Sequence, residues 1–159
     1  MVSVRIVCVG KLKEKWLSDA CAEYSKRLSR YCQLTVTELA EHTLPEAPGA
    51  AQIAAALEKE GAEIIKACEG CYVIAACREG KQFSSEELSE KIQKLSVEGH
   101  GKLAFVIGSS HGLAPSVEQR ADMKVSFSKL TFPHQLFRVM LLEQIYRAFS
   151  ISAGAKYHK

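Results

Sequence analysis

The amino-acid sequence predicts an α/β layer fold with a mainly parallel sheet. Apolar runs typical of strands alternate along the chain with stretches whose apolar residues recur at helical spacing. The first run, Val2–Val9, is nearly continuous, which suits a strand buried on both faces. The chain has 159 residues, of which 47% are hydrophobic and 25% are charged, so its length and composition fit a single domain over residues 1–159.

In the first half of the chain, Gly10 ends the first strand. Apolar residues at helical spacing, beginning with Trp16, predict a helix, and an alternating stretch rich in Thr and Val predicts a second strand. Pro45, Pro48 and Gly49 indicate a loop before an alanine-rich helix. The elements expected here are a helix over 15–31, a strand over 33–40, a helix over 50–67 and a strand over 71–77.

In the second half, Ser84 and Glu87 have the spacing of a capping box, which begins a helix. Gly99 and Gly101 separate this helix from the next strand. Pro133 stands near the first turn of the last helix, where proline fits. The elements expected here are a helix over 85–97, a strand over 103–107, a short helix over 115–121, a strand over 124–127 and a long helix over 134–150.

Charge and hydropathy exclude several classes of protein. The net charge is only +3, but residues 101–159 carry 8 basic and 3 acidic residues, a local charge of +5. Such a basic end can attract a polyanion, although an ordinary positive surface explains the local charge equally well.

No apolar run reaches the roughly 18 residues of a membrane-spanning helix, and the N-terminus lacks the order of a secretory signal. We therefore expect a cytoplasmic protein that does not enter a membrane.

The six cysteines do not predict a disulfide framework, because no secretory signal accompanies them. Cys68 and Cys71 form a single C-x-x-C pair, and a structural zinc site would need two more ligands at workable spacing. Cys8 and Cys77 lie in predicted strands, where cysteine acts as a small buried hydrophobic residue. We therefore expect no metal site.

Three loops are candidates for a binding site. Ligands of parallel sheets bind beyond the carboxyl ends of the strands, and the loops over residues 76–81, 108–113 and 128–132 each follow a predicted strand. Gly108 and Gly112 would let the backbone turn tightly and approach a ligand, although a plain tight turn has the same pattern. The third loop mixes apolar residues with small hydroxyls, which can cover the face and meet the polar edge of a heterocycle.

The last predicted helix carries several polar residues on a largely apolar background. His134 stands at its N-terminus, where it could accept a hydrogen bond or a proton, and a capping or packing histidine would fit equally. Glu143 and Arg147 are spaced to pair with each other. Arg138 has no local partner, so it is a better candidate than Glu143 or Arg147 for contact with a ligand or a second subunit.

The chain closes on Tyr157, His158 and Lys159. An aromatic ring, an imidazole and a cation could stack on a base and contact phosphate. A disordered tail is the alternative.

Six motifs together resemble one family over the whole chain. They are VGK at 9–11, EGK at 79–81, IGSSHGL at 107–113, FSKLTFPHQLFR at 127–138, LEQIYRA at 142–148 and YHK at 157–159. Their order and spacing are similar to those of the bacterial ribosomal RNA large-subunit methyltransferase H family, small SPOUT-class enzymes that methylate N3 of a pseudouridine in 23S rRNA. The resemblance implies a SPOUT-type fold with a C-terminal trefoil knot. It also implies S-adenosylmethionine as methyl donor and a homodimer whose interface borders the cofactor.

The resemblance further implies which residues form the site. By position, the cofactor contacts fall on the same three loops, at Ala76, Gly108, Phe127, Ser128, Lys129, Leu130, Thr131 and Phe132. Two positions depart from the family pattern. Ser109 stands where a second glycine is common, and Ala76 where a larger aliphatic residue is common.

The implied reaction transfers a methyl group to an imide nitrogen whose proton must leave, so we expect the protein mainly to orient the two reactants. His134 and His158 are candidate proton acceptors. Arg138 is a candidate for stabilising the developing anion or binding phosphate, and Tyr157 for stacking on a flipped-out base.

A chain this small and this weakly charged has little surface for gripping naked RNA, so we expect 23S rRNA to be presented by an assembled ribosome or large subunit. One alternative is a non-catalytic RNA- or ribosome-binding module with the same fold. Another is an enzyme that acts on a small molecule or nucleotide through the turn at residues 108–112.

Overall fold

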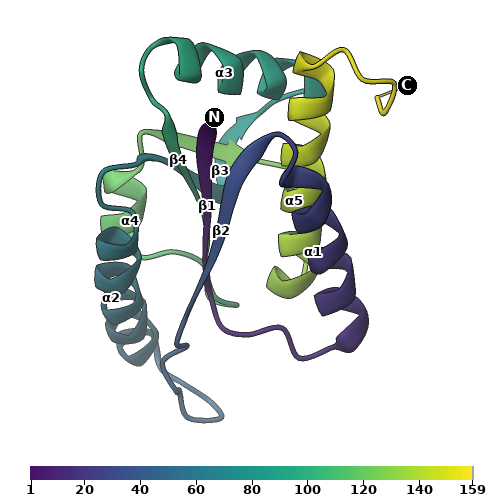
Figure 1. Ribbon diagram of the computed structural model, residues 1–159. Coiled ribbons are helices and arrows are strands. Elements are labelled where there is room, and N and C mark those ends of the chain that lie inside the picture. Colours follow the sequence, from purple (N-terminus) through teal and green to yellow (C-terminus); the bar gives the residue numbers. More distant parts are fainter. Residues whose placement is uncertain (159) are drawn as a thin grey trace.

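The computed structural model describes residues 1–158 and contains a five-stranded sheet whose paired strands all run parallel (Figure 1). The strands are β1 (Val2–Val9), β2 (Cys32–Leu39), β3 (Tyr72–Gln82), β4 (Lys102–Ile107) and β5 (Met123–Ser126), in the spatial order β2-β1-β4-β3-β5. The helices are α1 (Lys15–Leu28), α2 (Ala50–Ala67), α3 (Ser85–Val97), α4 (Pro115–Arg120) and α5 (His134–Ser152). The predicted α/β class and parallel sheet are confirmed, and most predicted boundaries differ from the observed ones by only a few residues.

Helices cover both faces of the sheet. Figure 1 shows α2 and α4 on one side, with α1 and α5 on the other, where α3 packs against α5. Successive side chains of β1 point to opposite faces of the sheet, and Val4, Ile6 and Cys8 lie in the core under α1, α3 and α5. Val7 and Val9 enter the second core, under α2 and α4. A central parallel strand therefore needs the near-continuous apolar run seen in the sequence, because solvent reaches neither face.

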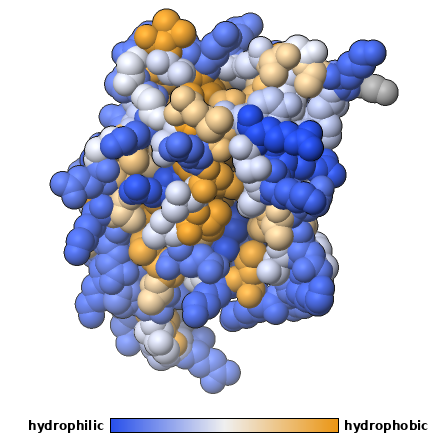
Figure 2. Space-filling model, viewed as in Figure 1, coloured by the Kyte–Doolittle hydropathy of each residue, from blue (hydrophilic) through white to orange (hydrophobic). Residues whose placement is uncertain are grey.

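The strand β2 forms one edge of the sheet. Its side chains mostly alternate between more and less exposed positions, but the alternation is interrupted at Thr35 and Val36, which are both exposed, Val36 to 40%. Figure 2, which shows the same face as Figure 1, has apolar residues gathered along its middle, where β2 lies in front, with hydrophilic residues on both sides. This edge position explains why apolar and polar residues alternate in the sequence of the second strand, whereas the first strand is almost continuously apolar.

The third strand is longer than predicted, because β3 continues to Gln82 through residues that the sequence assigns to a loop. Ala76 and Lys81 both pair with Val125 of β5, so the residues between them bulge out of the ladder. A Cβ atom at Gly80 would lie only 2.4 Å from the Val125 carbonyl carbon. The glycine therefore permits close approach of two backbones, where the sequence alone suggested only a turn.

The cysteines form no disulfide, since all six thiols are free. Burial raises the pKa of Cys8, Cys32 and Cys68 to about 11, so these thiols stay protonated and pack as core residues. Cys77 was expected to be buried but is only half-buried, because it lies in the bulge of β3. Residues 1–158 contain no group of three or more His, Cys, Asp or Glu side chains arranged to hold a metal ion.

None of the helices in the described part of the chain is long and apolar enough to span a bilayer.

Candidate functional site

The carboxyl ends of β3, β4 and β5 open into a cavity of about 780 Å³. In Figure 1 this edge of the sheet is the lower one, where β1 ends and α5 begins. Sites for small organic molecules usually measure about 300–1,000 Å³, so a ligand of nucleotide size fits. The walls come from the three predicted loops, from α4 and from the first turn of α5. The lining residues are Ala76, Cys77, Arg78, Glu79, Ile107, Gly108, Ser109, Ser110, His111, Gly112, Leu113, Glu118, Val125, Ser126, Phe127, Ser128, Leu130, Thr131, Phe132, Pro133, His134 and Phe137.

The loop after β4 doubles back on itself. A Cβ atom at Gly108 would lie 2.2 Å from the carbonyl oxygen of Gly112, a distance that no side chain tolerates. The N–H of Gly112 donates to the carbonyl oxygen of Ser109 at 2.9 Å, and Gly112 itself has φ of +90°. Glycine at both positions lets this loop present its backbone to the cavity.

The loop after β5 is held by its own hydroxyl groups. The Ser126 hydroxyl donates to the carbonyl oxygen of Ser128 at 3.1 Å, and the Ser128 hydroxyl accepts from the N–H of Leu130 at 3.0 Å. The ring of Phe127 packs against Phe137 of α5, with 4.7 Å between ring centroids. The serines therefore fix the loop conformation while the aromatic residues supply apolar surface, as its composition predicts.

His134 lies in the cavity wall at the first residue of α5. The β1–α1 connection packs beside it. A Cβ atom at Gly10 would lie 4.0 Å from the His134 Nε2 atom, and the N–H of Lys13 donates to Gln135 Oε1 at 3.0 Å. Of the four residues predicted to be catalytic, His134 is the one that the described chain places in the cavity.

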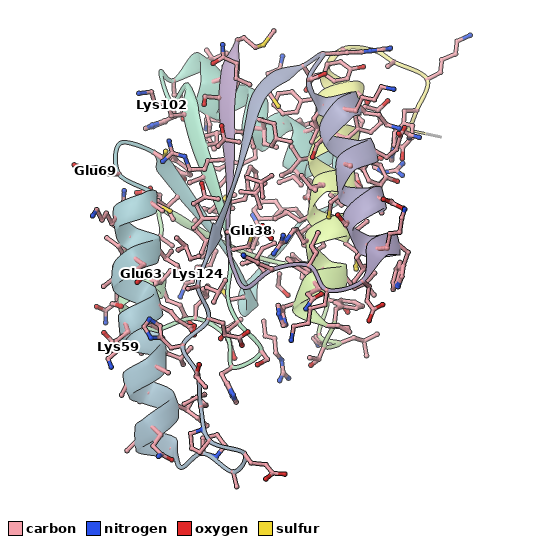
Figure 3. The ribbon with its side chains drawn as sticks, turned by 60° about the horizontal axis from the view of Figure 1, so that its bottom comes forward. Glu38, Lys59, Glu63, Glu69, Lys102 and Lys124 are labelled. Carbon is pink, nitrogen blue, oxygen red and sulfur yellow. The ribbon has the colours of Figure 1, made fainter. Side chains whose placement is uncertain are left out.

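Arg138 does not line the cavity. Its side chain is only 3% exposed, and it donates to Glu38 Oε2 at 2.7 Å and to the Gly10 carbonyl oxygen at 3.1 Å. Figure 3 labels Glu38 on β2. The sequence shows no local partner for Arg138 because the partner lies 100 residues earlier, on the edge strand. The arginine therefore joins α5 to β2 and to the residue that follows β1, and its predicted role toward a ligand stays a prediction.

The terminal segment folds back along α5. The Tyr157 hydroxyl donates to Glu143 Oε1 at 3.1 Å, and the Arg147 guanidinium lies 4.8 Å from the centre of the Tyr157 ring. Burial, Tyr24 and Glu143 raise the pKa of Tyr157, so its hydroxyl stays protonated.

His158 contacts both α5 and α3, because its Nδ1 atom lies 3.4 Å from the Arg147 guanidinium and its Nε2 atom lies 2.6 Å from Glu86 Oε1 of α3. The predicted pairing of Glu143 with Arg147 is confirmed, because Arg147 Nε donates to Glu143 Oε1 at 3.0 Å. Lys159 lies outside the described residues.

A single chain does not bring Tyr157 and His158 into the cavity. Glu143, which holds Tyr157, stands nine residues after His134 on α5. At about 1.5 Å per residue, this spacing corresponds to roughly 14 Å along the helix axis. The predicted catalytic residues therefore divide into His134 at the cavity and the terminal pair farther along α5.

Seven of the eight residues predicted to contact a cofactor line the cavity, and Lys129 does not. Sequence reasoning missed Phe137 and Glu118. Phe137 could have been found, because it stands three residues after His134 and so shares its face of the helix. No local signal identifies Glu118, since tertiary packing alone places α4 at the cavity.

Comparison with known proteins places this chain among methyltransferases. A family model described as "Predicted SPOUT methyltransferase" matches residues 2–158. A protein of Clostridium novyi named ribosomal RNA large subunit methyltransferase H is 52% identical over 159 residues, covering 99% of this chain and all of that protein. Proteins of the same name from Clostridium acetobutylicum and Bifidobacterium adolescentis are 50% and 49% identical, with the same coverage.

Solved structures show the same fold at low sequence identity. A probable methylase family protein from Haemophilus influenzae is 18% identical with a TM-score of 0.58, covering all of this chain and 72% of that one. A probable methyltransferase from Bordetella pertussis is 13% identical with a TM-score of 0.57, covering 93% of this chain and 96% of that one. The SPOUT-type arrangement of sheet and helices is therefore shared beyond the close relatives.

Proposed function

Because this chain belongs to the SPOUT methyltransferase family, and its full-length relatives are named ribosomal RNA large subunit methyltransferase H, we propose that it methylates N3 of a pseudouridine in 23S rRNA. The methyl donor is S-adenosylmethionine, and the substrate is an assembled ribosome or large subunit in the cytoplasm. Residues 1–159 act as one methyltransferase domain, and the C-terminal trefoil knot stays a prediction. The observation that carries the proposal is the cavity at the carboxyl ends of β3, β4 and β5.

The cavity suits S-adenosylmethionine in size and in chemistry. At Gly108 a Cβ atom would collide with the opposite side of its own loop, so the ligand meets backbone there. Phe127 and Phe132 offer apolar faces, while Ser128 and Thr131 bring hydroxyl groups. The residues proposed to hold the cofactor are Ala76, Gly108, Phe127, Ser128, Leu130, Thr131 and Phe132.

When bound, S-adenosylmethionine supplies a methyl group activated by its positive sulfur. The three loops orient the two reactants, and orientation of this kind can lower a barrier by roughly 7–11 kcal/mol. His134, in the cavity wall, accepts the N3 proton directly or through water, which typically adds about 10²–10⁴-fold in rate. Arg138 is a positioning residue, because its contacts with Glu38 and Gly10 fix the first turns of α5.

Two copies of the chain make one complete site in this proposal. Tyr157 and His158 lie along α5 away from His134 of the same chain, so a second copy supplies them. A second cavity of about 440 Å³ adjoins the first at the end of β5, with Tyr24, Val139 and Met140 among its lining residues. This partly apolar surface beside the active cavity is where we place the homodimer contact.

Transfer of label from S-[methyl-³H]adenosylmethionine tests the proposal. The purified chain is incubated with ribosomes, with isolated large subunits and with naked 23S rRNA, and the nucleosides are identified by mass spectrometry. We expect N3-methylpseudouridine from the assembled particles. Binding to ribosomes without methyl transfer would instead establish the non-catalytic module, and indifference to ribosomes would favour a small-molecule enzyme.

A further inference from the structure

We propose that Glu143 of α5 is a positioning residue for methyl transfer, because its carboxylate holds Tyr157 directly and His158 through Arg147. The proposal rests on the proposed function, in which these two terminal residues act in the site of a second copy. It deepens that function by giving a role to a carboxylate that does not line the cofactor cavity.

Glu143 is the one acidic residue of α5, and its side chain is only 17% exposed. Carboxylates are rarely buried to this extent unless hydrogen-bond donors surround them. Oε1 accepts from the Tyr157 hydroxyl at 3.1 Å and from both Nε and Nη2 of Arg147. Oε2 accepts from Gln144 Nε2 at 2.7 Å. Both carboxylate oxygens are therefore occupied by donors, one of which belongs to the terminal segment.

Arg147 extends this arrangement to His158. Its Nη1 atom lies 3.4 Å from His158 Nδ1, while its other two nitrogens donate to Glu143. A guanidinium can only donate, so in the neutral imidazole Nδ1 accepts and the ring proton is on Nε2. Nε2 in turn lies 2.6 Å from Glu86 Oε1. Glu143 thus orients the imidazole through Arg147, and the two neighbours of the ring select which nitrogen carries the proton.

Aromatic contacts fix the plane of the Tyr157 ring. The ring meets Tyr146 edge-on, with 4.7 Å between the centroids, and the Arg147 guanidinium lies over it at 4.8 Å. A ring held by its hydroxyl, by a second ring and by a cation has little freedom left. The terminal segment therefore offers Tyr157 to a substrate base with part of the entropic cost of ordering already met.

Gln144 connects Glu143 to α3. The Ser85 hydroxyl donates to Gln144 Oε1 at 2.8 Å, and Gln144 Nε2 donates to Glu143. Ser85 and Glu86 stand in the first turn of α3, which begins with a capping box, and α3 packs along α5. Two packed helices therefore support the groups that hold the terminal residues, which is the arrangement that fixes a functional side chain most precisely.

Single-turnover kinetics and cofactor titration of Glu143→Ala test the inference. We expect the rate at saturating S-adenosylmethionine to fall about 100-fold, because a misplacement of about 1 Å can cost this much. The Kd for S-adenosylmethionine should stay within about twofold, because Glu143 is outside the described lining of the cofactor cavity. Glu143→Gln keeps an oxygen acceptor for Tyr157 and should recover part of the loss. Glu90→Ala, at an exposed acid of α3, is the matched control and should change neither value.

Mixed dimers separate this role from a role in the cavity of the same chain. Glu143→Ala chains should restore activity to His134→Ala chains, to about a quarter of wild type, because one chain keeps an intact cavity and the other keeps an intact terminal segment. They should not restore activity to chains that lack residues 155–159, because neither chain then presents Tyr157 and His158 correctly.

The reverse pattern in the two mixtures would overturn the inference, as would a wild-type rate in Glu143→Ala. Dissociation of Glu143→Ala into monomers, measured by sedimentation, would also overturn it, because the carboxylate would then serve the contact between subunits. If Glu143→Ala does not fold, Tyr157→Phe decides, since it removes only the hydroxyl that Glu143 holds, and an unchanged rate overturns the inference. A wild-type chain that transfers no methyl group would instead refute the proposed function.

Discussion

At Gly108 the main chain leaves no room for even one methyl group, because a Cβ atom would lie 2.2 Å from the Gly112 carbonyl oxygen. The same loop lines the cavity at the carboxyl ends of β3, β4 and β5. Because glycine has no Cβ atom, the backbone at residue 108 can adopt the conformation that is proposed to contact the ligand.

Gly108→Ala should abolish measurable cofactor binding while lowering the free energy of unfolding by about 1–3 kcal/mol, the usual cost of overpacking. Calorimetric titration with S-adenosylmethionine and urea unfolding measure the two effects. Gly101→Ala is the matched control, since a Cβ atom there meets nothing within 4 Å. Normal affinity in Gly108→Ala would show that the loop backbone is not the contact surface.

Arg138→Ala should lower the free energy of unfolding by about 2–3 kcal/mol, less than a fully buried pair would lose, because Glu38 is half-exposed and can be solvated. The methyl transfer rate per folded molecule should stay within about threefold of wild type. Denaturant titration and single-turnover kinetics at low temperature separate the two effects. A normal stability with a large loss in rate would return Arg138 to the catalytic residues.

Glu60 should make stability depend on pH. Burial raises its pKa in the folded chain above the unfolded value, so between these values the folded chain binds more protons. The free energy of unfolding of wild type, relative to Glu60→Gln, should therefore fall as the pH rises from the ordinary carboxyl range through the raised pKa of Glu60. Urea titrations of the two proteins at a series of pH values measure this difference in the free energy of unfolding.

At the scale of elements, α5 links the cavity to the terminal segment. Its first turn contributes His134 and Phe137 to the cavity wall, while Glu143 and Arg147 hold Tyr157 farther along. Side chains of α5 enter the hydrophobic core under α1, α3 and α5, but that core includes no side chain from residues 153–158. The terminal segment therefore contributes little to the stability of the chain that carries it.

Deleting residues 155–159 should leave the melting temperature within about 3 °C of wild type. Methyl transfer should nevertheless fall by at least about 100-fold, because the aromatic and imidazole groups proposed to act on the substrate are lost. Thermal unfolding and the tritium assay measure these outcomes. Full activity in the truncated chain would remove Tyr157 and His158 from the mechanism.

At the scale of the whole molecule, the separation of His134 from Tyr157 requires a second copy in the proposed mechanism. Mixing His134→Ala chains with chains that lack residues 155–159 tests this directly. If pairing is random, half of the dimers are mixed and each holds one complete site, so activity should recover to about a quarter of wild type. Continued inactivity of the mixture, with both proteins folded and dimeric, would contradict a shared site.

Local sequence is enough to identify the elements and most of the cavity. Uninterrupted apolar residues in β1, alternation in β2 and the capping box before α3 each depend on neighbours in the chain, so the fold class and the three loops can be predicted. Tertiary structure alone decides the extension of β3 beside β5, the long-range partner of Arg138 and the burial of Glu60 on α2. The physical reason is that these three features depend on groups far apart in sequence, whose approach is set by the packing of whole elements.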